Sequence, residues 1–68
     1  NRYVKSLKRL GFKLIDSKIE NDRIDKVYRD SSITVRISLF TQVKNGNTDT
    51  YYSFLVTTNE DYLLNYEN

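Results

Sequence analysis

The dipeptide Asn45-Gly46 constrains the fold more than any other feature of this sequence. It lies between SITVRISLFTQVK and TDTYYSFLVTT, two segments in which apolar and polar residues alternate with a period of two. A type I′ turn needs positive φ at both of its central residues, and Asn-Gly meets this need readily. The sequence therefore predicts a long antiparallel β-hairpin that closes at these two residues.

Two shorter alternating segments precede this hairpin. FKLIDSKI and RIDKVYR are separated by a turn at Asn21–Asp22, and a further turn at Asp30–Ser31 is predicted to lead into the long hairpin. Two-residue loops at all three turns predict a four-stranded meander with defined cross-strand pairs. The expected pairs are Ile15–Tyr28, Ile19–Ile24, Ile24–Ile37, Tyr28–Ile33, Ile37–Phe54 and Leu39–Tyr52.

This register collects large apolar residues on one face of the predicted sheet. The expected set is Ile15, Ile19, Ile24, Tyr28, Ile33, Val35, Ile37, Leu39, Tyr52, Phe54 and Val56, interrupted by Ser17 and Lys26. On the opposite face we expect a row of alternating charges formed by Lys18, Asp25 and Arg36. Thr34, Ser38, Ser53 and Thr57 are expected to face solvent there.

Both ends of the chain have helical patterns. Residues 2–10 place Tyr3, Val4, Leu7 and Leu10 on one stripe, and Gly11 suits the position just after a helix. The tail TTNEDYLLNYEN begins with Thr58 or Asn59 as a cap and predicts a second, short helix. The predicted fold class is α+β, with the order α-β-β-β-β-α in a single domain over residues 1–68. The first helix is expected to pack on the isoleucine-rich face.

The composition argues against catalysis. The 68 residues include no cysteine and no histidine, which excludes disulfides, thiolate metal sites and the usual catalytic base. Phosphate-binding glycine loops are also absent. The acids around the first hairpin lack the spacing of a calcium loop; they are Asp16, Glu20, Asp22 and Asp25. We therefore expect a non-enzymatic chain with no cofactor and no metal ion.

Compartment and origin follow from similar arguments. An apolar run of about 20 residues, which a bilayer-spanning helix needs, is absent, and so is a signal-peptide pattern. The expected location is the cytoplasm of a bacterial host cell, with no membrane partner. The chain lacks proline and alanine and is rich in Asn, Lys, Ile and Tyr, whose codons are AT-rich. This indicates a gene from a low-GC bacterium, a phage or a mobile element.

The stretches LGFKLI and YRDSSITVRI, in a helix-meander-helix order, resemble the HicA-type RNA-cleaving toxins and other folds of the double-stranded-RNA-binding type. Those toxins carry a Gly-Ser-His motif on an early strand, with a catalytic histidine. The corresponding stretch here is IDSKIENDR, which has neither Gly nor His, and a fourth strand departs from their three-strand pattern. The resemblance therefore implies a related topology and no RNase activity.

One group of residues has the composition of a protein-binding site. The predicted register places Phe40, Tyr51, Leu55 and Arg36 together at a corner of the sheet face directed away from the helices. Tyr and Arg are frequent energetic anchors of protein interfaces, whereas exposed sheet aromatics can also stack on nucleic-acid bases. Burial of this corner by the tail helix or by a second copy is the remaining alternative.

The leading functional hypothesis is a small protein-binding module that uses this corner. Its size and composition are typical of inhibitors or accessory proteins that phages and mobile elements direct at host enzymes of defence or nucleic-acid handling. A purely structural homodimer, closed through a strand edge or through the aromatic corner, is a further hypothesis.

The basic residues at the start of the chain support an alternative function. Residues 1–13 carry a net charge of +5, contributed by Arg2, Lys5, Lys8, Arg9 and Lys13, whereas residues 45–68 carry −4. A helix with such a face can rest on a phosphate backbone, which would make the chain a nucleic-acid-binding accessory protein. The competing interpretation is a solvated helix face that the acidic tail partly neutralises.

Overall fold

The structure is a computed structural model that describes residues 2–66. The elements follow in the order α1 (Arg2–Arg9), β1 (Lys13–Glu20), β2 (Arg23–Arg29), β3 (Ile33–Lys44), β4 (Asn47–Thr58) and α2 (Asn59–Asn65). The strands form one open antiparallel sheet in the sequential order β1-β2-β3-β4. The predicted α+β class and its order of elements are confirmed.

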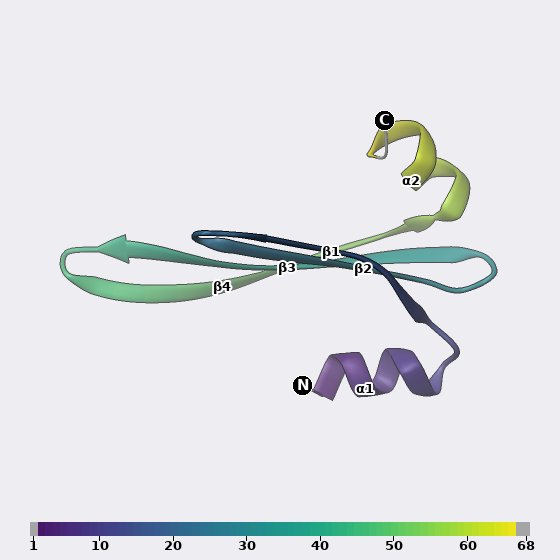
Figure 1. Cartoon of the computed structure of the whole chain (residues 1–68), viewed down its shortest axis with the longest axis horizontal. Helices are drawn as coiled ribbons and strands as arrows, with labels where there is room; N and C mark the ends of the chain where they lie inside the picture. The colour runs from purple at the N-terminus through teal and green to yellow at the C-terminus, as the bar shows by residue number, and fades with distance from the viewer. Residues whose placement is uncertain (1, 67–68) are drawn as a thin grey trace.

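The two helices lie on opposite faces of the sheet (Figure 1). The face covered by α1, named the α1 face, is the isoleucine-rich one. Its core consists of Tyr28, Val35 and Ile37, and the partly buried residues packed against it are Val4, Leu7, Phe12 and Ile33. The other face, named the α2 face, carries α2 at the end of the sheet remote from the β3–β4 turn (Figure 1). Neither helix of the described chain is long and apolar enough to cross a membrane.

The β3–β4 hairpin has the predicted geometry. Asn45 and Gly46 have φ angles of 54° and 78°, as a type I′ turn requires. Ile37 opposes Phe54 and Leu39 opposes Tyr52, so both predicted pairs are confirmed. Each strand of this hairpin has 12 residues, against 8 in β1 and 7 in β2. The turn end of the hairpin therefore extends past the other two strands. We name the end of the sheet that carries this turn and the β1–β2 turn the hairpin end; it includes the last rows that cross all four strands.

The predicted turn between β2 and β3 is wrong by one position. The loop is Ser31–Ser32, because the Asp30 carboxylate accepts hydrogen bonds from the backbone N–H groups of Ser32 (2.8 Å) and Ile33 (2.7 Å). The backbone N–H of Asp30 also donates to the Ile33 carbonyl at 3.0 Å. These bonds make Asp30 and Ile33 the closing pair of the turn.

This turn shifts the β2–β3 register by two residues from the prediction. Ile24 opposes Leu39 instead of Ile37, and Tyr28 opposes Val35 instead of Ile33. A shift by an even number of residues keeps every side chain on its predicted face, because side chains alternate with a period of two. The predicted faces are therefore retained in β2 and β3, although the predicted pairs are wrong.

The first hairpin departs from the prediction at one point. Ile19 opposes Ile24 as expected, but the register shifts between Leu14 and Asp16. Leu14 opposes Tyr28, and Ile15 is the extra residue of a β-bulge, so the predicted pair Ile15–Tyr28 is wrong. Bulges are frequent in edge strands, where the loss of one ladder position costs little.

Helix α2 buries part of the face that was expected to be solvated. Thr58 caps the helix by accepting a 3.1 Å hydrogen bond from the backbone N–H of Asp61. Tyr62 is buried, and its ring lies beneath the Arg29 guanidinium at 5.7 Å. Thr34 is completely buried and Ser38 nearly so, and the expectation that these two face solvent is wrong.

Candidate functional site

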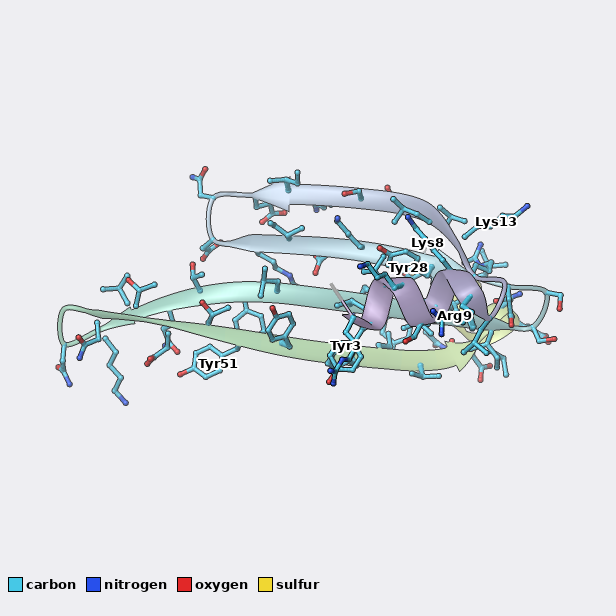
Figure 2. All side chains as sticks on the ribbon, turned by 90° about the horizontal axis from the view of Figure 1, so that it is seen from below. Tyr3, Lys8, Arg9, Lys13, Tyr28 and Tyr51 are labelled. Carbon is cyan, nitrogen blue, oxygen red and sulfur yellow. The ribbon has the colours of Figure 1, made fainter. Side chains whose placement is uncertain are left out.

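Phe40 and Tyr51 form a stacked aromatic pair on the α2 face of the hairpin end. They are direct cross-strand partners, and their ring centroids lie 5.6 Å apart at an interplanar angle of 26°. Phe40 is 36% exposed and Tyr51 is 42% exposed. Figure 2 shows Tyr51 on β4, well separated along the strand from Tyr3 of α1, and α2 lies at the opposite end of the sheet (Figure 1). Neither helix therefore reaches this pair.

Arg23 is the cation that lies next to the aromatic pair. It opposes Phe40 across β2 and β3, and Glu20 opposes Arg23 across β1 and β2. The resulting row across the sheet is Glu20, Arg23, Phe40 and Tyr51. Sequence reasoning missed Arg23 because the predicted register placed it two positions away. The signal that could have found it is the Asp30 side chain, since Asp at the first position of a turn accepts hydrogen bonds from backbone N–H groups two and three residues further on.

Arg36 and Leu55 lie apart from the aromatic pair, beside α2. They oppose each other in β3 and β4, and both are half-buried. The Arg36 guanidinium lies 5.3 Å from the ring centroid of Tyr66, which follows α2. The four-residue corner expected from the sequence is thus divided into two cross-strand pairs. Phe40 with Tyr51 remains open, whereas Arg36 with Leu55 lies under the C-terminal segment.

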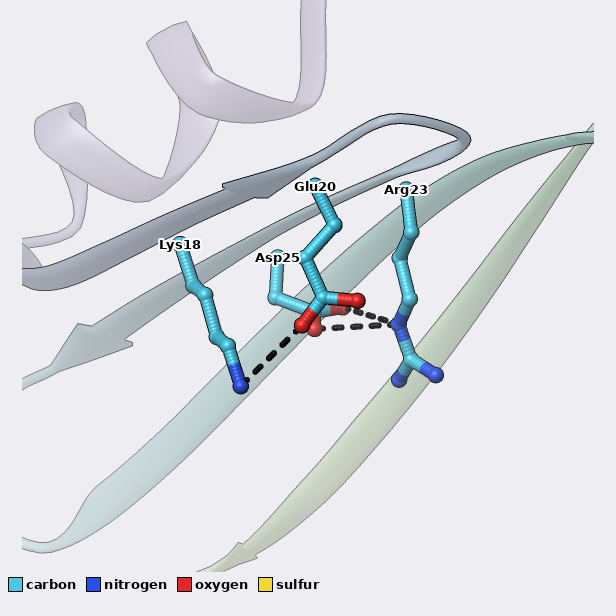
Figure 3. A network of polar contacts seen from close by, with 4 residues as sticks. All are labelled: Lys18, Glu20, Arg23 and Asp25. Carbon is cyan, nitrogen blue, oxygen red and sulfur yellow. Dashed lines mark hydrogen bonds and ion pairs between the residues drawn. The ribbon is translucent and has the colours of Figure 1, made fainter.

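A quartet of charges occupies the β1–β2 side of the α2 face (Figure 3). Lys18 pairs with Glu20 at 3.1 Å, and Arg23 Nε pairs with Asp25 at 3.0 Å. Lys18 also opposes Asp25, as predicted, but Asp25 opposes Ser38 instead of Arg36. Opposite charges therefore alternate both along and across the strands.

The pKa of Asp25 reflects this environment. Burial raises the pKa, but hydrogen bonds from Ser38 and Arg23 and the positive charges of Arg23 and Arg36 together hold it below its ordinary value. Asp25 is therefore a charged structural partner of Arg23. In residues 2–66, no group of three or more acids is arranged to hold a metal ion.

The α1 face of the hairpin end is also open. A row of apolar residues crosses all four strands there; it consists of Ile19, Ile24, Leu39 and Tyr52. Ile19 is 74% exposed and Tyr52 is 55% exposed. A groove of about 260 Å³ lies between this row and α1, and Val4 and Lys26 contribute to its lining. Among the described residues, 14 large apolar side chains are exposed and five are buried, so the helices leave much of the sheet uncovered.

The basic residues surround α1 and the segment that follows it. Arg2, Lys5 and Arg9 line one surface hollow together with Ser6. Figure 2 shows Lys8, Arg9 and Lys13 around the C-terminal half of α1 and the start of β1. In the part of the chain that the structure describes, none of these cations forms an ion pair.

The acids Glu60 and Asp61 belong to α2 and lie on the other side of the sheet from this basic surface. The idea that the acidic tail neutralises α1 is therefore wrong for the described residues.

Comparisons with protein-family models, with curated proteins and with solved structures each found no match for this chain. The functional assignment therefore rests on three surfaces. They are the Phe40–Tyr51 pair on the α2 face, the apolar row on the α1 face, and the basic surface of α1.

Proposed function

We propose that this chain is a small, non-enzymatic protein-binding module whose contact surface is centred on Phe40 and Tyr51. The observation that carries this proposal is the stacked, exposed aromatic pair on a region of sheet that neither helix covers. The stacked rings present a large contact area with few rotatable bonds, so that a partner gains apolar burial at a small entropic cost. Arg23 beside them is held in place by Asp25 and supplies a fixed cation at the rim.

The surface around Phe40 and Tyr51 has the arrangement of residues that is typical of a protein interface. Aromatic residues and Arg are enriched at the centres of such interfaces, and Tyr and Arg often contribute most of the binding energy. Here the aromatic pair forms the centre, and Glu20, Arg23 and Asp25 form a polar border on one side of it. This arrangement suits a partner that offers an apolar recess with polar groups around it.

The class of partner is proposed from composition. A chain of 68 residues without Cys or His, rich in Asn, Lys, Ile and Tyr, suits an inhibitor or accessory protein of a host enzyme in defence or nucleic-acid handling. Such a protein acts by covering a surface of its target, for which a rigid sheet with exposed aromatics is well suited.

The test is affinity capture with three forms of the chain as bait. They are the wild type, Phe40→Ala combined with Tyr51→Ala, and the matched control Thr41→Ala combined with Thr50→Ala, a cross-strand pair on the opposite face of the same hairpin. We expect the wild type and the control to retain the same host protein and the aromatic variant to lose it. Retention of that protein by all three forms would contradict the proposal.

A second candidate function, nucleic-acid binding, is favoured by the separation of charge across the sheet. The cations of α1 are exposed, and α1 lies on the face of the sheet opposite α2 (Figure 1), so the acids of α2 do not shield them. A phosphate backbone could approach this surface, and its affinity would fall steeply with salt.

Titration of mixed DNA and RNA fragments at two salt concentrations tests this second function. Lys5→Glu with Lys8→Glu should abolish binding, whereas Lys18→Glu, on the other face of the sheet, should change it little. If the affinity changes neither with the salt concentration nor in the Lys5→Glu, Lys8→Glu variant, the basic surface is not the binding site.

A further inference from the structure

The two edges of the sheet are built differently. Strand β1 has a bulge after Leu14, and half of its eight residues are charged: Lys13, Asp16, Lys18 and Glu20. Strand β4 has 12 residues in an unbroken register and only one charge, Asp49. Bulges and charges are the devices that stop an edge strand from pairing with another chain. Edge β1 is therefore protected against strand addition, and edge β4 is open to it.

The geometry points to a second copy of this chain as the occupant of edge β4. We infer that two chains pair β4 with β4 in an antiparallel manner, about a two-fold axis at Phe54, to form a continuous eight-stranded sheet. This inference goes beyond the proposed function, because it concerns the backbone edge of β4 instead of the α2 face of the sheet, and a different partner. The arguments for it are the backbone geometry of β4, its side chains and its charges.

Backbone geometry selects the residues that can pair. The two-residue turn makes Lys44 and Asn47 a hydrogen-bonded pair, and such pairs recur at every second position of an antiparallel ladder. The even-numbered residues of β4 consequently direct their N–H and C=O groups outward. Tyr52, Phe54 and Val56 are among them. An axis at Phe54 places Tyr52 opposite the second copy's Val56, with all outward groups paired.

The side chains of these same residues form an apolar strip along the edge. Tyr52, Phe54 and Val56 all lie on the α1 face, and Val56 is 64% exposed. Phe54 packs edge-on against Tyr3 at 5.4 Å and stacks with Tyr52 at 6.4 Å. Two copies joined at Phe54 bring both such clusters together across the axis. Apolar surface that a single chain leaves in water is then buried.

Charge complementarity favours the antiparallel two-fold arrangement. Lys44 is the only Lys or Arg after Arg36, and it lies at the turn of the hairpin, on the α2 face. Glu60 and Asp61 lie at the start of α2, at the other end of β4 (Figure 1). None of the three forms an ion pair within the described residues. The two-fold axis brings Lys44 of each copy towards Glu60 and Asp61 of the other.

Substitutions at the axis test the inference directly, because Phe54 would face its own copy. Phe54→Lys alone and Phe54→Glu alone each place like charges opposite one another and should give monomers of 8.1 kDa in sedimentation equilibrium. An equimolar mixture of the two variants should restore a species of twice that mass. Wild type should be dimeric. Circular dichroism of each variant checks that the sheet is retained.

The matched control is Ile19→Lys, which makes the same kind of change on the same face but at the protected edge β1. It should remain dimeric. Dissociation of the dimer by Ile19→Lys to the same extent as by Phe54→Lys would show association through the apolar face and overturn strand pairing. A wild type that stays monomeric, or that forms only a complex with a foreign protein, would also overturn the inference.

A crosslink supplies a second measurement that does not depend on Phe54. The axis places Ser53 opposite the second copy's Leu55, whereas the two Ser53 residues lie roughly 8 Å apart, which is too far for a disulfide. Because the chain has no cysteine, an oxidised mixture of Ser53→Cys and Leu55→Cys should give the mixed disulfide dimer. Ser53→Cys alone should give little of its own dimer. Equal crosslinking in both cases would refute the register.

Discussion

The hydroxyl of Thr34 donates a 2.7 Å hydrogen bond to Oδ1 of Asn59 and thereby joins the start of β3 to the first residue of α2. The amide of Asn59 in turn donates to the backbone carbonyl of Asp30 at 3.1 Å. Thr34 also accepts a 2.9 Å hydrogen bond from Nε of Arg29. A residue expected to face solvent is thus the point at which α2, the β2–β3 turn and the sheet are connected.

Thr34→Val should lower the free energy of unfolding by about 1–3 kcal/mol, because the side chains of Asn59 and Arg29 each lose a hydrogen bond to the buried Thr34 hydroxyl. Urea denaturation measures the loss. Thr41→Val, at an exposed position on the same strand, is the control and should change the free energy by less than about 0.5 kcal/mol. Equal effects at the two positions would show that the network around Thr34 contributes no stability.

Asp30 should make stability depend on pH. Hydrogen bonds from the backbone N–H groups of Ser32 and Ile33 lower the pKa of its carboxyl group in the folded chain. Because the folded pKa lies below the unfolded value of about 3.9, the stabilisation is present above that value and is lost as the pH falls through the folded pKa.

The measurement is urea denaturation of the wild type, Asp30→Ala and Asp30→Asn across this acid range. Asp30→Ala should be less stable than the wild type at neutral pH and approach it in strong acid. Asp30→Asn keeps an acceptor oxygen that does not titrate, so it should retain more stability at neutral pH. A difference between wild type and Asp30→Ala that is constant with pH would contradict this account.

Gly46→Ala should destabilise the long hairpin by about 1–2 kcal/mol, the cost of holding an L-residue in the left-handed region. Gly46 has a φ of 78°, and no heavy atom outside Gly46 and its two chain neighbours lies within 4 Å of the position that a Cβ would take, so the cost arises from the backbone conformation. Gly46→Asn should cost less, because Asn tolerates this region. Thermal and urea unfolding measure both changes, and a larger loss for Asn than for Ala would be inconsistent with the type I′ turn.

Phe40 and Tyr51 should interact with a coupling energy of about 0.5–1 kcal/mol, as is typical of cross-strand aromatic pairs. A double-mutant cycle of Phe40→Ala and Tyr51→Ala measures it. The expected loss of stability is small because both rings are exposed, so the double variant stays folded and a loss of partner binding can be assigned to the surface. A coupling energy near zero would show that the stacked geometry is not maintained in solution.

Except at the start of β1, before the bulge, the sequence alone determined which strand residues share a face of the sheet and where the long hairpin turns. Alternation with a period of two assigns each strand residue to one face, and Asn45-Gly46 fixes the β3–β4 register through its positive φ angles. The same information placed Phe40 opposite Tyr51 and away from the isoleucine-rich face. The helix signals were also sufficient, since Gly11 ends the first helical segment and Thr58 caps the second.

Only the tertiary structure decided the β2–β3 register, the bulge beside Ile15 and the face that α2 covers. Alternation cannot distinguish registers that differ by two residues, because both leave every side chain on the same face. The choice depended on the hydrogen bonds that the Asp30 carboxylate makes to Ser32 and Ile33. These hydrogen bonds place Arg23 beside Phe40 and leave Arg36 to pack on Tyr66. Which residues surround the exposed aromatic pair therefore depends on a polar contact of Asp30, and the alternation of apolar and polar residues in the sequence carries no information about that contact.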